Sequence, residues 1–118
     1  MTQARPFGRC KTISTQALAA GFKGLGYVQA AVLFGSRALG RTHPRSDYDF
    51  ALLMTPLPEE EWGMQARAWG DVCALFGLKE WDVDIVDMQR MDEALKHSIQ
   101  EGYLLLKGDE NEVRRLLS

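Results

Sequence analysis

Residues 32–53 read VLFGSRALGRTHPRSDYDFALL, in which two apolar runs are separated by a polar loop. The first run ends at Gly35-Ser36, as is typical of a strand whose last turn exposes backbone N–H groups. The second run begins with Asp47 and Asp49, two residues apart. Side chains two residues apart on a strand point to the same side, so both carboxylates are expected to face one place. Because a bare pair of carboxylates would repel, a divalent metal ion is the expected occupant.

The composition indicates one globular domain. The chain has 118 residues, of which 46% are hydrophobic and 25% charged, enough to build a buried core. A net charge of −2 argues against a protein that holds nucleic acid through an excess of Lys and Arg. Cys10 and Cys73 lack metal-ligand spacing, and neither a signal-peptide region nor an apolar run of the ~20 residues that cross a bilayer is present. We therefore expect a cytoplasmic protein with no direct nucleic-acid partner and no membrane partner.

Periodicity divides the chain into an arm and a domain. Residues 1–11 are polar and show no period, so they are predicted to form an N-terminal arm before a single domain of residues 12–118. Apolar residues recur at helical spacing from Thr12 to about Lys23 and again from residue 59 to residue 76. Glu59-Glu60-Glu61 are predicted to lie in the first turn of this second helix. Its expected core-facing residues are Trp62, Ala66, Trp69, Cys73 and Phe76.

The remaining segments complete a small sheet with helices. Short apolar or alternating runs predict four strands, at residues 30–34, 47–54, 81–88 and 103–106. One or two helical turns are expected over Arg37 to Gly40. Asp92 is predicted to cap a helix that ends at Gly102, and Asp109 with Glu112 is predicted to form a reciprocal cap for a terminal helix.

The motif of residues 35–49 is similar to that of a known family. The minimal nucleotidyltransferase (MNT) family of the DNA polymerase β superfamily carries Gly-Ser, a spacer and Asp-x-Asp. Here Gly35-Ser36, ten intervening residues and Asp47-Tyr48-Asp49 reproduce this pattern. The resemblance covers residues 12–106 and implies an α/β (α+β) nucleotidyltransferase fold, with a small mixed sheet of about four strands flanked by helices.

A third carboxylate of the family lies on a later strand, in an apolar context. Residues 83–87, VDIVD, fit that description. Asp84 is the predicted third carboxylate, because apolar residues flank it on both sides, although Asp82 and Asp87 remain alternatives. The resemblance implies two Mg²⁺ ions held by Asp47, Asp49 and Asp84, one of them also binding the triphosphate of ATP and the other beside the attacking hydroxyl.

The Gly35-Ser36 turn is the predicted phosphate-binding element. Its backbone N–H groups and the serine hydroxyl would contact the β and γ phosphates of ATP, and glycine would permit their close approach. Arg37 and Arg45 are candidates for stabilising phosphate charge. The leaving group would be pyrophosphate, because attack falls on the α-phosphorus.

The short chain resembles enzymes that act on a partner. Larger members of the superfamily add a helical domain that holds the acceptor, whereas about a dozen residues follow the matched region here. MNT proteins encoded beside a HEPN-type ribonuclease toxin act as antitoxins by transferring AMP from ATP to a tyrosine hydroxyl of the toxin, and the resemblance implies this role. A non-catalytic nucleotide-binding antitoxin and an oligomeric small-molecule nucleotidyltransferase remain alternatives. A homo-oligomer and a hetero-oligomer are both left open.

Overall fold

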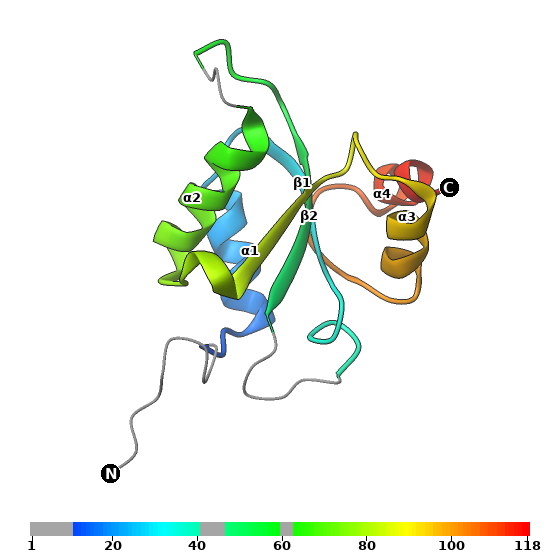
Figure 1. Cartoon of the computed structure of the whole chain (residues 1–118), viewed down its shortest axis with the longest axis horizontal. Helices are drawn as coiled ribbons and strands as arrows, with labels where there is room; N and C mark the ends of the chain where they lie inside the picture. The colour runs from blue at the N-terminus through cyan, green and yellow to red at the C-terminus, as the bar shows by residue number, and fades with distance from the viewer. Residues whose placement is uncertain (1–10, 41–46, 60–62) are drawn as a thin grey trace.

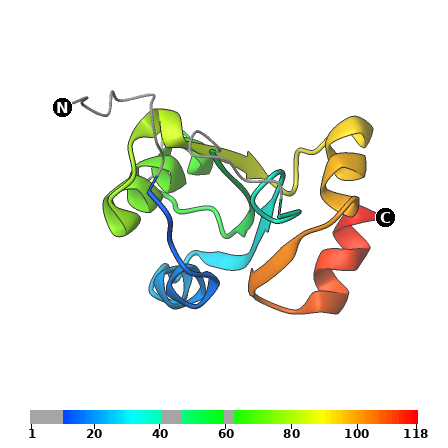
Figure 2. The same cartoon turned by 90° about the horizontal axis from the view of Figure 1, so that it is seen from below.

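A four-stranded sheet separates two pairs of helices (Figure 1). The structure is a computed structural model that describes residues 11–40, 47–59 and 63–118. In chain order the elements are α1 (Thr15–Lys23), β1 (Val28–Phe34), β2 (Tyr48–Met54), α2 (Met64–Phe76), the 3₁₀ turn η1 (Glu80–Asp82), β3 (Val83–Asp87), α3 (Glu93–Gln100), β4 (Leu104–Lys107) and α4 (Glu110–Leu117). Seen from below, α1 and α2 lie on one side of the strands and α3 and α4 on the other (Figure 2).

The sheet is mixed, as predicted. Its strand order is β3-β2-β1-β4. Strand β1 runs antiparallel to both of its neighbours, β2 and β4, whereas β2 and β3 are parallel and are connected through α2. Two neighbouring parallel strands begin at the same end of the sheet, and this arrangement brings the starts of β2 and β3 together. The predicted α/β (α+β) architecture, a small mixed sheet of four strands flanked by helices, is confirmed.

Each face of the sheet carries its own core. Under α1 and α2, the rings of Phe22 and Phe50 meet edge to face with centroids 5.2 Å apart, and Phe76 packs 5.5 Å from Phe22. Under α3 and α4, a smaller core includes Ala51 and Ile99. Aromatic pairs in these offset geometries add stability beyond the area that they bury. Because alternate residues of β2 enter different cores, both faces of this strand are covered.

The predicted helix caps of α3 and α4 are present. The Asp92 carboxylate accepts a hydrogen bond from the Leu95 N–H at 2.8 Å, and that of Asp109 accepts one from the Asn111 N–H at 3.0 Å. Such bonds satisfy backbone donors that a helix leaves unpaired at its start. Glu112, predicted to complete a reciprocal cap with Asp109, instead lies 3.7 Å from Arg115.

Helix α2 begins later than predicted. Its first residue is Met64, so Glu59 lies outside the helix, and Glu60 and Glu61 lie outside the described residues. The physical reason is Gly63, whose φ of +97° is incompatible with a helical turn. The predicted core-facing stripe is wrong for Ala66, which is exposed, while Ala68, Val72 and Phe76 form the buried face.

The third strand is shorter than predicted. Trp81 and Asp82 belong to η1, and β3 begins at Val83. The Asp82 carboxylate accepts a hydrogen bond from the Lys79 N–H at 3.2 Å, which closes this turn. A polar residue that bonds nearby backbone in this way competes with strand formation. The first strand is longer than predicted, because it already begins at Val28.

The contact between α1 and α2 gives a stability prediction. A Cβ added at Gly21 would overlap Cε1 of Phe76, whose ring is packed between those of Phe22 and Phe50. Gly21→Ala is therefore expected to lower the free energy of unfolding by about 1–3 kcal/mol. The matched control is Gly70→Ala within α2, where a Cβ meets nothing within 4 Å, and this change should add roughly 0.5–1 kcal/mol. Urea denaturation measures both, and equal effects would contradict the packing account.

Among the residues that the structure describes, helices long and apolar enough to cross a membrane are absent.

Candidate functional site

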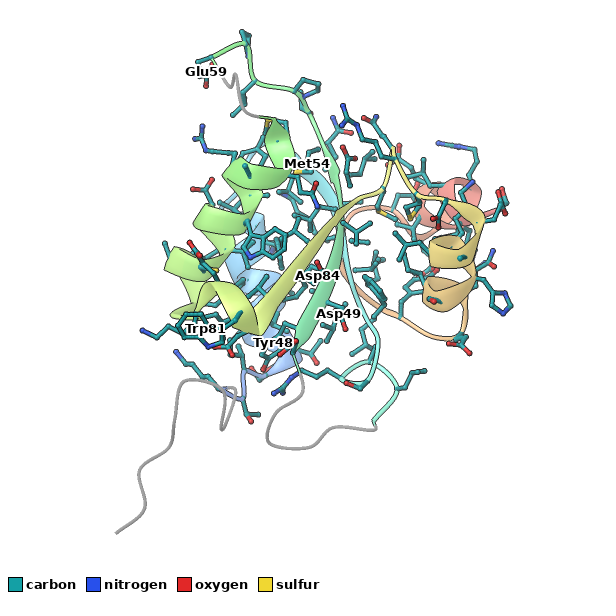
Figure 3. All side chains as sticks on the ribbon, in the orientation of Figure 1. Tyr48, Asp49, Met54, Glu59, Trp81 and Asp84 are labelled. Carbon is teal, nitrogen blue, oxygen red and sulfur yellow. The ribbon has the colours of Figure 1, made fainter. Side chains whose placement is uncertain are left out.

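Asp49 and Asp84 lie side by side on neighbouring strands. Asp49 of β2 is the register partner of Asp84 of β3 in the parallel pair. The residues flanking Asp49, Tyr48 and Phe50, both enter the core under α1 and α2, so the Asp49 side chain points to the opposite face. The same alternation applies to Asp84. Figure 3 shows both carboxylates near the end of the sheet at which β2 begins.

Gly35 places the backbone of β1 directly against one of these carboxylates. Phe34, the last residue of β1, pairs with Asp49. Gly35 follows with φ +77°, and a Cβ there would overlap Oδ2 of Asp49. This position therefore requires glycine for two independent reasons, its backbone conformation and the space beside it. The backbone of the Gly-Ser turn and the Asp49 carboxylate share one site.

The segment after Ser36 is anchored to the rest of the fold. The N–H groups of Ala38 and Leu39 both donate to the Gly35 carbonyl at 3.1 Å, which gives the single helical turn expected there. Leu39 reaches Gly102, where an added Cβ would stand 2.6 Å from its Cδ2. The predicted phosphate-binding turn is thus packed against the junction between α3 and β4.

The three aspartates interact electrostatically. The pKa of Asp49 is raised from 3.8 to about 6, first by burial and then by the negative charges of Asp84 and Asp47. Burial and like charges both disfavour the ionised form. Asp47 and Asp84 themselves are exposed. A cation bound beside Asp49 would offset the burial of its carboxylate and its repulsion by Asp84 and Asp47.

The carboxylates near Asp49 fit a magnesium ion for which the protein supplies only some of the ligands. Over residues 11–40, 47–59 and 63–118, no group of three or more His, Cys, Asp or Glu side chains is close enough to hold a metal ion. Mg²⁺ is commonly bound by one or two carboxylates together with substrate phosphates and water. Asp49 with Asp84 or Asp47 offers such hard oxygen donors, so the residues present fit an ion whose remaining ligands come from a nucleotide.

The alternatives to Asp84 are engaged in local structure. Asp82 is buried and closes η1. Asp87 accepts a hydrogen bond from the Gln89 N–H at 2.9 Å and lies 3.9 Å from Arg90. Of these three residues, Asp84 is the one paired with Asp49, which supports its choice as the third carboxylate.

Of the two arginines predicted to contact phosphate, the structure describes Arg37. Arg45 lies outside the described residues. The Arg37 guanidinium lies 4.1 Å from the centre of the Tyr48 ring. The Tyr48 hydroxyl donates to the Lys11 carbonyl and accepts from the Ile13 N–H, both at 2.8 Å. Sequence reasoning gave Tyr48 no role beyond its place between the two aspartates of the motif, whereas in the structure its buried hydroxyl finds hydrogen-bond partners.

Two surface hollows lie apart from the aspartates. One, of about 300 Å³, is lined by Met54, Gly63 and Arg90 among others, at the opposite end of β2. The other, of about 450 Å³, lies between α1 and α2 and includes Ile13 and Leu75. Neither of these two hollows includes Asp49 or Asp84 in its lining.

Comparisons with known proteins agree with this geometry. The family model "Polymerase beta, Nucleotidyltransferase" matches residues 16–111. No curated protein matches the sequence.

Solved structures share the fold at low sequence identity. A chain in the crystal structure of a toxin–antitoxin with AMP-PNP has a TM-score of 0.66 and 19% identity, and the match covers 89% of this chain and 82% of that chain. A chain in the complex of a tri-AMPylated Shewanella oneidensis HEPN toxin with MNT antitoxin has a TM-score of 0.61 and 17% identity, with 88% and 81% covered. For a chain in the toxin-antitoxin MntA-HepT the values are 0.59 and 17%, with 88% and 80% covered.

Proposed function

Because the chain belongs to the polymerase beta nucleotidyltransferase family, we propose that it is a Mg²⁺-dependent enzyme that transfers AMP from ATP to a tyrosine hydroxyl of a HEPN-type toxin and so acts as a cytoplasmic antitoxin. The observation that carries the proposal is the meeting of three elements at one end of the sheet. These are the Gly35 turn, the Asp49 carboxylate against it, and Asp84 in register on the next strand.

In the proposed reaction the protein mainly positions ATP and the acceptor hydroxyl and neutralises the charge of the phosphates. The backbone N–H groups of Gly35 and Ser36 and the serine hydroxyl receive the β and γ phosphates. The oxygen of the acceptor hydroxyl forms a bond to the α-phosphorus, the bond from that phosphorus to the bridging oxygen of the β-phosphate breaks, and pyrophosphate leaves. Asp84 accepts the hydroxyl proton or directs it to solvent.

The carboxylates are the proposed metal ligands. Asp47, Asp49 and Asp84 would share the binding of two magnesium ions with the oxygens of the triphosphate and water. Bound magnesium would supply charge neutralisation for the nucleotide and a lower pKa for the attacking hydroxyl. The raised pKa of Asp49 supports a cation at this place, because the carboxylate is destabilised without one.

The exposure of two of the three carboxylates supports a protein acceptor. Asp47 and Asp84 are exposed, so a tyrosine on another molecule can approach them without a channel. Structures similar to this chain include a HEPN toxin–MNT antitoxin complex in which the toxin is AMPylated. These two observations favour modification of a partner protein over a small-molecule acceptor bound in an enclosed pocket.

The test is the intact mass of a HEPN-type toxin, to be sought as the product of a gene adjacent to the one that encodes this protein. After incubation with this protein, ATP and Mg²⁺, the toxin should gain the mass of one or more AMP units, and peptide mapping should place them on tyrosine. The matched reaction contains the variant Asp47→Ala/Asp49→Ala, which should add none. An unchanged mass with the wild-type protein, together with inhibition of the toxin by simple complex formation, would identify a non-catalytic antitoxin instead.

The assignment of Asp84 gives a separate prediction. Asp84→Asn is expected to lower the transfer rate about 10²- to 10³-fold, because it removes one metal ligand and proton acceptor at constant shape. Asp87→Asn is the matched control, since Asp87 lies on the same strand and bonds only local groups in the contacts given above. It should change the rate by less than about threefold. The opposite ranking in a pyrophosphate-release assay would mean that Asp84 is not the third carboxylate.

A further inference from the structure

We propose that Arg37 is a positioning residue that holds the Gly35–Gly40 turn in place by stacking on Tyr48, the residue between the two aspartates of the motif. The Arg37 guanidinium lies 4.1 Å from the centre of the Tyr48 ring. A guanidinium at this distance over an aromatic ring is attracted by the negative electrostatic potential of the ring face. The contact joins the turn directly to β2, the strand that carries Asp49 and begins immediately after Asp47.

Tyr48 is a rigid support for this contact. Its side chain is 1% exposed, and its ring is nearly parallel to that of Phe50, with centroids 5.8 Å apart. The hydroxyl makes two hydrogen bonds. It donates to the Lys11 carbonyl and accepts from the Ile13 N–H. A ring held in this way offers the guanidinium a constant surface on which to stack.

The turn is held from both faces of the sheet. Arg37 and Ala38 pack toward the core under α1 and α2, whereas Leu39 contacts Gly102 between α3 and β4. Three consecutive side chains therefore anchor the backbone that begins at Gly35. Since Gly35 touches the Asp49 carboxylate, a small rotation of the turn would alter the distance between the phosphate-binding N–H groups and the aspartates.

A different arginine provides a matched control within the same chain. Arg67 of α2 lies 5.6 Å from the centre of the Tyr27 ring, and its Nε is 3.1 Å from Asp71. This pair also places an arginine over a tyrosine ring, but in other elements and with an additional ion pair to Asp71. A change there reports the general effect of losing an arginine that lies over a tyrosine ring, together with its ion pair.

The first experiment is amide hydrogen exchange of Ala38 and Leu39, whose N–H groups bond to the Gly35 carbonyl. Arg37→Gln should speed their exchange about 3- to 10-fold, in line with the loss of one cation–π contact. Arg67→Gln should leave it unchanged. Replacing Tyr48 by phenylalanine should keep most of the protection of these two amides against exchange. Replacing it by trifluorophenylalanine, which has nearly the shape of phenylalanine but a less negative ring face, should speed their exchange as Arg37→Gln does. Unchanged exchange in both Arg37→Gln and the fluorinated variant would overturn the proposal.

The second experiment separates positioning from direct phosphate binding, and it rests on the proposed function. The fluorinated Tyr48 variant retains Arg37, so an arginine that acts only as a phosphate ligand would give an unchanged KM for ATP. We expect the KM of the fluorinated Tyr48 variant for ATP to be about 3- to 10-fold higher than that of Tyr48→Phe. Adding Arg37→Gln to the fluorinated variant should raise this KM no further. Additive effects would overturn the stacking role. If the wild-type protein binds no ATP, the proposed function fails, while hydrogen exchange still decides the inference.

Discussion

Asp49→Asn is expected to make the protein more stable at pH 7.5 and inactive in nucleotidyl transfer. The raised pKa of Asp49 means that the folded protein tolerates its carboxylate less well than the unfolded chain does. Asparagine keeps the shape and removes the charge. The transfer rate should fall by about 10³-fold or more, because this carboxylate is the proposed metal ligand nearest the Gly35 turn.

The sign of the pH dependence follows from the same shift. The folded-state pKa is raised from 3.8 to about 6, so the stabilising contribution of protonated Asp49 is complete below about pH 4 and is lost as pH rises through 6. At pH 7.5 the metal-free wild-type protein carries the full destabilisation, which we expect to be about 1–2 kcal/mol after screening by solvent. The advantage of Asp49→Asn should therefore shrink toward pH 4.

Urea denaturation in the presence of a chelator measures this difference. The matched control is Asp71→Asn, which removes a carboxylate that accepts a hydrogen bond from the Tyr27 hydroxyl at 2.7 Å and pairs with Arg67 at 3.1 Å. That change should lower stability, since the carboxylate has favourable partners. If Asp49→Asn is as destabilising as Asp71→Asn, then Asp49 is a structural carboxylate and the functional assignment is wrong.

Gly35→Ala is expected to weaken nucleotide binding, whereas Gly40→Ala is expected to preserve it. Both glycines have a left-handed backbone, with φ +77° and +72°. A Cβ at Gly35 overlaps the Asp49 carboxylate, whereas one at Gly40 meets nothing within 4 Å. Each change should cost about 1–2 kcal/mol in backbone strain, but only the first displaces a functional side chain.

Calorimetric titration with ATP and Mg²⁺ distinguishes the two glycine variants. We expect the affinity of Gly35→Ala to fall at least about 10-fold, the effect of moving one charged ligand by a fraction of an ångström. Gly40→Ala should bind within about twofold of the wild-type protein. Equal losses in the two variants would mean that strain in the turn, and not space beside Asp49, governs binding.

Much of the fold could be predicted from patterns along the chain. The run that ends at Gly35 and the alternation from Asp47 to Met54 predicted two strands, and both are present as β1 and β2. The caps at Asp92 and Asp109 were predicted from residue type alone, because their hydrogen bonds are local. Local chemistry was the part that sequence reasoning predicted best.

Three features escaped prediction, and the last two of them depend on contacts between distant residues. The acidic run at Glu59 was assigned to a helix that in fact begins after Gly63, since periodicity does not mark where a helix starts. The register that pairs Asp49 with Asp84 requires the parallel arrangement of β2 and β3. The stacking of Arg37 on Tyr48 depends on how a turn folds back over a strand, for which the sequence has no periodic signal.

The most direct test of the central claim, that Asp47, Asp49 and the Gly35 turn form one magnesium–nucleotide site, is calorimetric titration of ATP with and without Mg²⁺. The wild-type protein should bind ATP at least about 10-fold more tightly when Mg²⁺ is present, because the carboxylates bind the triphosphate through the ion. Asp47→Asn should remove most of this difference while its circular dichroism spectrum stays that of the wild type. The same ATP affinity with and without Mg²⁺ in the wild-type protein would contradict the account.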